Sequence, residues 1–194
     1  MNSKTKLFLI TSFAFIGVMS VPLLFAQDNA KSEMRTNIIN LTKYTDGQGR
    51  FSISYPSSWN VQPATNRFQT VAVAFTNRVF TNSSFASVNI VIDNAPTQTD
   101  PALYLDSSLS APVYSGFSLF QNVECTKYKV DGNKACDMVF TGNPSGNLPV
   151  AVLQIASYVD KKAYTFTMAG SQDDFDSYLT TFDNMLASFR SPAG

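Results

Sequence analysis

A regular alternation of apolar and polar residues begins near residue 50. Phe51, Ile53 and Tyr55 alternate with serines, and Pro56 ends this run because proline cannot donate to a sheet ladder. The same period of two recurs in four later segments, at 88–92, 136–140, 151–155 and 164–168. This period predicts strands with one buried face. Residues 71–75 are apolar on both faces, as in a central strand, and the pattern as a whole predicts about seven strands.

One mid-chain segment has helical spacing instead. Asp100 and Pro101 suit the cap and the first position of a helix, which Pro112 would end by Ala111. The residues of this helix that we expect to face the core are Ala102, Leu105 and Leu109.

A second helix is predicted at the end of the chain. Ser171 suits its N-cap, with Asp174 in the capping-box position. Apolar residues then recur at spacings of three and four: Phe175, Tyr178, Leu179, Phe182, Met185, Leu186 and Phe189. A stripe of this kind packs against a core. Asp173, Asp174 and Asp176 are better explained by the helix dipole than by a metal cluster. Hairpin-linked strands with two helices predict an α+β fold in which helices cover a mainly antiparallel sheet.

The two cysteines flank a hairpin signal, Asp131-Gly132-Asn133. Strands on either side of this turn would bring Cys125 and Cys136 together, and an even cysteine count in an exported chain favours a disulfide. Two free, buried thiols are the alternative. A redox or catalytic pair is disfavoured because the spacing differs from Cys-x-x-Cys and no base is available.

Residues 1–26 combine a basic start, an apolar run and Ala26, which is the pattern of a signal peptide. The run is also close to the length of a membrane span, so a retained N-terminal membrane anchor is the alternative. Residues 27–43 are predicted to form a flexible tether, and residues 44–190 are predicted to form one domain. We expect an extracytoplasmic protein, secreted or anchored on the outer face of the cytoplasmic membrane. Asn40 and Asn82 fit the glycosylation acceptor pattern.

Histidine is absent from the whole sequence. Its absence removes the side chain that titrates near neutral pH, together with Ser-His and Cys-His catalysis. A Ser-x-x-Lys match, Ser3 to Lys6, lies inside the signal segment. We therefore expect no enzymatic activity. The 14 basic and 14 acidic residues balance, and there is no basic patch, so nucleic acid is a poor partner.

The carboxylate of Asp46 is a candidate calcium ligand. Asp46 begins the glycine-rich segment Asp46-Gly47-Gln48-Gly49, which could place an oxygen ligand near calcium. Because calcium takes six to eight oxygens, a turn explains this segment better, and the sequence identifies no metal ligands. Trp59, the only tryptophan, is predicted to pack in the core, with a docking hot spot as the alternative.

The block from Tyr44 to Trp59 joins an aromatic residue, Asp-Gly, a Phe-led strand, Tyr-Pro and Trp. It resembles the opening of the PsbP family. The mid-chain helix, the lysine-bearing turn before an aromatic strand (Lys161 to Phe166) and the closing Met185-Leu186-Ala187-Ser188-Phe189 are also similar. The resemblance covers residues 44 to 190. It implies the Mog1/PsbP-like fold, an α/β/α sandwich around a mainly antiparallel sheet.

The resemblance also implies a function. Plant and cyanobacterial members of the family associate with photosystem II and support retention of calcium and chloride. We therefore expect a non-enzymatic accessory protein that docks on a membrane or envelope complex outside the cytoplasm. A small-molecule or divalent-cation binding module is the alternative, with calcium as its candidate cation. Metal sites of some members use histidine, which this chain lacks, so no cofactor is assigned from the resemblance.

Overall fold

The computed structural model describes residues 40–64, 71–77, 85–108, 116–143 and 148–192. Its strands are β1 (Leu41–Thr45), β2 (Ser52–Pro56), β3 (Asn60–Pro63), β4 (Val71–Thr76), β5 (Ala86–Asp93), β6 (Phe117–Glu124), β7 (Lys129–Val130), β8 (Asn133–Gly142), β9 (Val150–Val159) and β10 (Lys162–Ser171). Its helices are α1 (Pro101–Ser108) and α2 (Phe175–Ala187). The predicted signal segment and Asn82 lie outside the described residues.

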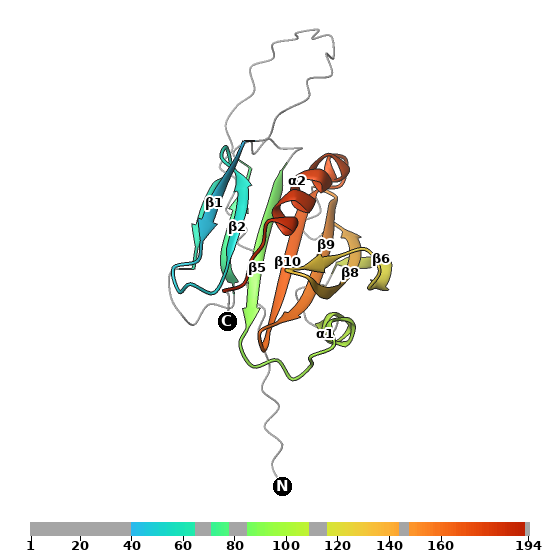
Figure 1. The fold of residues 1–194 in the computed structure, drawn as a ribbon. Coiled ribbons are helices and arrows are strands. Elements are labelled where there is room, and N and C mark those ends of the chain that lie inside the picture. Colours follow the sequence, from blue (N-terminus) through green and yellow to red (C-terminus); the bar gives the residue numbers. More distant parts are fainter. Residues whose placement is uncertain (1–39, 65–70, 78–84, 109–115, 144–147, 193–194) are drawn as a thin grey trace.

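Eight strands form one sheet with the order β3-β4-β5-β10-β9-β8-β6, in which β7 also pairs with β8. All of these pairings are antiparallel. The long strand β10 lies near the middle of the sheet, where Phe166 is opposite Ile90 on one side and Ile155 on the other (Figure 1). Asp160 and Lys161 both have positive φ at the β9–β10 turn, which is the conformation of a tight hairpin.

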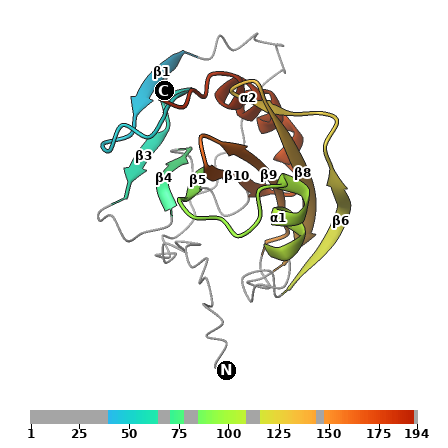
Figure 2. The same ribbon diagram turned by 60° about the horizontal axis from the view of Figure 1, so that its bottom comes forward.

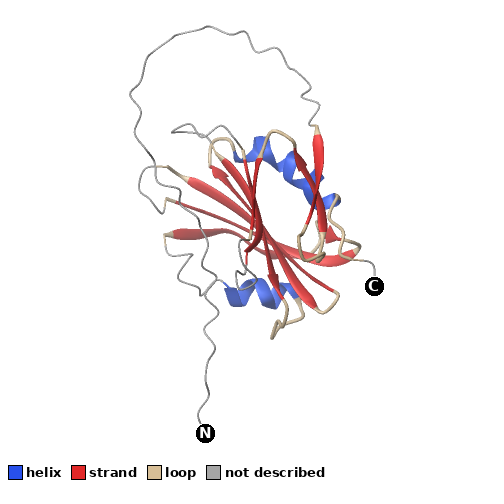
Figure 3. Ribbon diagram, turned by 90° about the vertical axis from the view of Figure 1, so that its left-hand side faces the viewer, coloured by secondary structure: helices blue, strands red, loops and turns tan. Residues whose placement is uncertain are grey.

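The two faces of the sheet carry separate hydrophobic clusters. The larger cluster joins α2 and β2 to one face and includes Phe51, Phe75, Phe166 and Phe189. The smaller cluster lies under α1 on the other face and includes Leu105 and residues of β8 and β9. Figure 3 shows the strands between the two helices. The predicted α/β/α sandwich around a mainly antiparallel sheet is therefore confirmed.

The start of α1 is the one that the sequence predicts. The Asp100 carboxylate accepts hydrogen bonds from the backbone N–H groups of Ala102 (2.8 Å) and Leu103 (3.3 Å), which is an N-cap. Leu105 is fully buried, as expected, and Ala102 packs at the edge of the same cluster. The predicted continuation to residue 111, including Leu109, lies outside the described residues.

The start of α2 differs from the prediction. Ser171 is the last residue of β10, and its hydroxyl donates to the Asp174 carboxylate (3.0 Å) instead of capping the helix. Asp174 is the N-cap residue, without a side-chain capping bond, and Asp176 is the acidic residue of the first turn. The predicted apolar stripe is confirmed, because Phe182, Met185, Leu186 and Phe189 are almost fully buried.

The folded region begins slightly before the predicted boundary. Leu41 to Lys43 fall in the predicted tether, but they are part of β1, which pairs with β2 in a separate two-stranded sheet. Within the described residues neither helix is long and apolar enough to cross a membrane.

Candidate functional site

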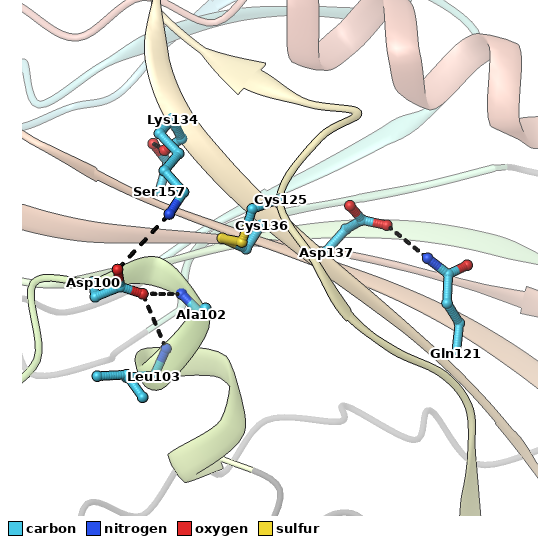
Figure 4. Close-up of a disulfide and its surroundings, with 9 residues drawn as sticks. All are labelled: Asp100, Ala102, Leu103, Gln121, Cys125, Lys134, Cys136, Asp137 and Ser157. Carbon is cyan, nitrogen blue, oxygen red and sulfur yellow. Dashed lines mark hydrogen bonds and ion pairs between the residues drawn. A yellow bond between two sulfur atoms is a disulfide. The ribbon is translucent and has the colours of Figure 1, made fainter.

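A disulfide marks the edge of the sheet where β6 meets β8. Cys125 follows the last residue of β6, Cys136 lies in β8, and the two are bonded across 11 positions of sequence (Figure 4). The intervening turn has positive φ at Asp131 and Gly132, as the hairpin signal predicts. The disulfide prediction is confirmed and the alternative of two free thiols is wrong.

Removal of this disulfide should measurably destabilise the protein. The Cys125→Ala/Cys136→Ala variant is expected to lose about 3 kcal/mol, because a closed loop of this length restricts the unfolded chain by that amount. The corresponding fall in Tm is roughly 6–12 °C for a domain of this size. Thermal unfolding of the full chain, oxidised and reduced, measures it. The reduced wild type should match the variant, and an unchanged Tm in both would contradict the prediction.

Asp137 lies next to the disulfide on β8 and is 2% exposed. One carboxylate oxygen, Oδ2, accepts a long hydrogen bond from the Gln121 amide (3.4 Å, Figure 4). The other, Oδ1, is buried without a hydrogen-bond partner. Burial raises the pKa of the Asp137 carboxyl; Glu124 acts in the same direction, while Lys127 and Gln121 oppose it. A buried carboxyl with an open oxygen is uncommon and calls for a specific explanation.

A second unpaired polar atom belongs to the same region. Tyr128 is 8% exposed, and its hydroxyl is buried without a hydrogen-bond partner. Burial raises the pKa of this phenol; the Lys127 ammonium at its hydroxyl opposes the effect, while Asp183 of α2 and Asp137 add to it. The Lys127 ammonium lies 4.6 Å from the centroid of the Tyr128 ring, on its exposed loop.

These side chains define what we call the Asp137 cluster: Gln121, Glu124, Lys127, Tyr128, Asp137 and Asp183. It has three carboxylates and one ammonium, and two of its buried oxygens have no partner. The cluster includes no histidine or cysteine nucleophile. Its arrangement suits binding of a hydrogen-bond donor better than nucleophilic or acid–base chemistry.

Neutralising Asp137 should change how stability depends on pH. The folded-state pKa is above the unfolded value, so the folded protein binds the proton more tightly, and stability falls as pH rises from the unfolded to the folded pKa. Asp137→Asn is therefore expected to be more stable than the wild type at pH 7, by about 1.4 kcal/mol for each pH unit between the two pKa values. Below pH 4 the difference should disappear. Urea unfolding at pH 3 and pH 7 tests this, and equal stabilities at pH 7 would contradict it.

Asp46 is not placed to serve as an open calcium ligand. Arg50 binds it through two hydrogen bonds of 2.8 Å, one to each oxygen. Oδ2 also accepts from the backbone N–H groups of Gln48 and Arg50. Burial alone would raise the pKa of Asp46, but the Arg50 and backbone bonds lower it overall. The predicted turn accounts for this segment, and calcium binding stays a prediction of the sequence.

The remaining predicted residues are distributed over the molecule. Trp59 is 7% exposed and packs edge-on against Tyr178, which confirms the core prediction. Asn40 is exposed directly before β1, so glycosylation there stays a prediction. Asp173 and Asp176 are exposed at the start of α2. No three Asp, Glu or Cys side chains converge as metal ligands within the ranges that the structure describes.

Sequence reasoning missed the Asp137 cluster. Alternation along β8 places Cys136, Met138 and Phe140 on one face. This pattern alone is compatible with a solvent-exposed Asp137 on the opposite face. A sheet that is covered by helices on both faces buries the side chains on both faces of β8. The predicted sandwich therefore could have indicated that Asp137, on the same face as Ala135 and Val139, is buried.

The fold is the Mog1/PsbP-like sandwich, as comparison with solved structures confirms. Cyanobacterial PsbP from Synechocystis sp. PCC 6803 is similar, with a TM-score of 0.58 and 18% identity over 83% of this chain and 98% of that one. The Ran-binding protein Mog1p of Saccharomyces cerevisiae has a TM-score of 0.53 and 10% identity, over 79% of this chain and 96% of its own.

LpqN of Mycobacterium tuberculosis, a protein involved in cell envelope biogenesis, has the same fold. Its TM-score is 0.50 at 14% identity, over 81% of this chain and 94% of its own. No protein-family model matches the sequence, and no curated protein matches it. At such identities the likeness concerns the fold alone.

Proposed function

We propose that this chain is a non-enzymatic accessory protein that acts outside the cytoplasm and docks on a membrane or envelope complex. The observation that carries the proposal is a disulfide-bonded domain of the Mog1/PsbP-like fold. Structural disulfides form and persist in oxidising compartments, which agrees with the predicted export segment. Cyanobacterial PsbP and the envelope protein LpqN have this fold, and both are consistent with an accessory role.

Two further observations support a binding role over catalysis. The sequence contains no histidine, and no metal-binding group of acids and cysteines is found within the described residues. Hydrophobic side chains fill both faces of the sheet. The parts of the domain that can bind a partner are therefore its surface and the Asp137 cluster beside the disulfide.

In-cell photo-crosslinking of the tagged full-length chain tests the proposal. A photoreactive residue is placed in turn at three exposed positions: Asn122 on β6, Leu103 on α1 and Thr180 on α2. We expect one dominant membrane or envelope complex, captured strongly from one position and weakly from the other two. The proposal would be refuted if none of the three positions gave a crosslinked product above the uncrosslinked background.

A further inference from the structure

The edge of the sheet at β6 and β8 contains two buried oxygen atoms that have no hydrogen-bond partner of good geometry within the described parts of the chain. They are Asp137 Oδ1 and Tyr128 Oη. Each comes from a side chain that is more than nine-tenths buried, and the charge of Asp137 acts on Tyr128. An unsatisfied buried carboxylate oxygen lacks a donor, and a phenol oxygen can accept one as well.

We infer that the Asp137 cluster receives the ammonium group of a lysine side chain from the docking partner. This inference rests on the proposed function, and it names the partner's chemistry. The ammonium would donate to Asp137 Oδ1 and would take the place of Lys127 beside the Tyr128 hydroxyl.

The local charge favours a cation. Asp137, Glu124 and Asp183 act on this region against Lys127 alone. Neither oxygen of Asp137 takes part in an ion pair of the described residues, because the Lys127 ammonium lies by the Tyr128 ring. A buried carboxylate without a counterion is unfavourable, and a cation from outside would remove that cost.

The geometry selects an ammonium over a guanidinium or a divalent metal. Gln121 already occupies Asp137 Oδ2, so only one carboxylate oxygen is open. A guanidinium binds best with both oxygens of a carboxylate, whereas an ammonium donates to single acceptors. A divalent metal needs more oxygen ligands than one carboxylate oxygen and one neutral phenol supply.

The position of the cluster suits a docking role. β6 is the last strand of the sheet, and Figure 2 shows it at the outer edge of the molecule. Thr126 and Lys127, next to Tyr128, are exposed on the short loop after the disulfide. Lys127 acts electrostatically on Asp137, so a partner lysine would take the place of Lys127 there.

The first test compares capture of the partner by three full-length chains. Asp137→Asn removes the charge with little change of shape, and Tyr128→Phe removes only the hydroxyl. The matched control is Asp106→Asn, an exposed aspartate on α1 across the sheet. We expect Asp137→Asn to reduce crosslinked partner at least about tenfold and Tyr128→Phe to reduce it several-fold. The control should match the wild type, and thermal melts confirm that all variants fold.

The second test needs no partner. Saturation-transfer NMR follows n-butylammonium, which mimics a lysine side chain, with neutral n-butanol as its control. We expect saturable binding of the amine to the wild type and to Asp106→Asn, at least about tenfold weaker binding to Asp137→Asn, and none of n-butanol.

The outcomes separate the two proposals. A partner captured equally by the wild type and Asp137→Asn supports docking and overturns the lysine site. If none of the chains captures a partner, docking is refuted. Amine binding that depends on Asp137 would then indicate a site for a free amine, and the inference of a partner lysine would be overturned. Absence of amine binding to the wild type overturns the inference.

Discussion

Replacing Phe189 with alanine should lower the free energy of unfolding by about 3–5 kcal/mol, the usual loss for a buried phenylalanine. Phe189 is fully buried directly after α2. Its ring stacks on Phe51 (5.6 Å between centroids) and meets Tyr164 (5.1 Å) and Phe166 (5.0 Å) edge-on. The residue thus joins the C-terminal segment, β10 and the start of β2, and its loss leaves a cavity where these three elements meet.

Urea unfolding of the full chain measures this loss. The control is Leu103→Ala, because Leu103 is 54% exposed on α1 and its truncation should change stability by less than about 0.5 kcal/mol. A loss below about 1 kcal/mol for Phe189→Ala would mean that this aromatic cluster does not form as described.

The second large effect is expected for Asp46→Ala, a loss of about 3 kcal/mol at pH 7. The side chains of Asp46 and Arg50 are only 4% and 13% exposed, so removing the carboxylate leaves a largely buried guanidinium unpaired. Two backbone N–H groups lose their acceptor as well. The double variant Asp46→Ala/Arg50→Leu should recover part of the loss, because it leaves no unpaired charge.

This ion pair also predicts a pH dependence. The pKa of Asp46 is lower in the folded protein, so its contribution is complete above the unfolded value near 3.8 and is lost as pH falls through the folded value. The difference in stability between the wild type and Asp46→Ala should therefore shrink below pH 4. Denaturant unfolding at pH 7 and pH 3 measures it, with exposed Asp173→Ala as the control. A difference that is equal at both pH values would argue against the ion pair.

The sequence predicts the strands whose apolar residues alternate cleanly. Residues 88–92 and 164–168 were expected as strands and are contained in β5 and β10. β6 escaped prediction because its pairing with β8 is interrupted at two places, between Leu119 and Gln121 and between Gln121 and Glu124, so its period of two is broken. β1 escaped because its side chains are mostly exposed and therefore show no apolar alternation.

The site is less predictable than the fold. Cysteine spacing and a hairpin signal were sufficient for the disulfide, since both are local features of sequence. The Asp137 cluster instead depends on β6, the loop after Cys125 and α2 meeting at one edge, and no local pattern encodes that meeting. The start of α2 was misplaced for a related reason: Ser171 fits a helix cap locally, but pairing with Val150 extends β10 through it.

The position of β10 has a consequence for how the chain folds. The N-terminal strands β3, β4 and β5 join the hairpins of β8 and β9 only through β10, where Ile90 pairs with Phe166. The two halves of the sheet are therefore united late in synthesis, by a contact between residues distant in sequence. Such non-local pairing slows folding and leaves the edge of β5 exposed until β10 arrives. The hairpin closed by Cys125 and Cys136 needs only nearby residues, so oxidation can precede completion of the sheet.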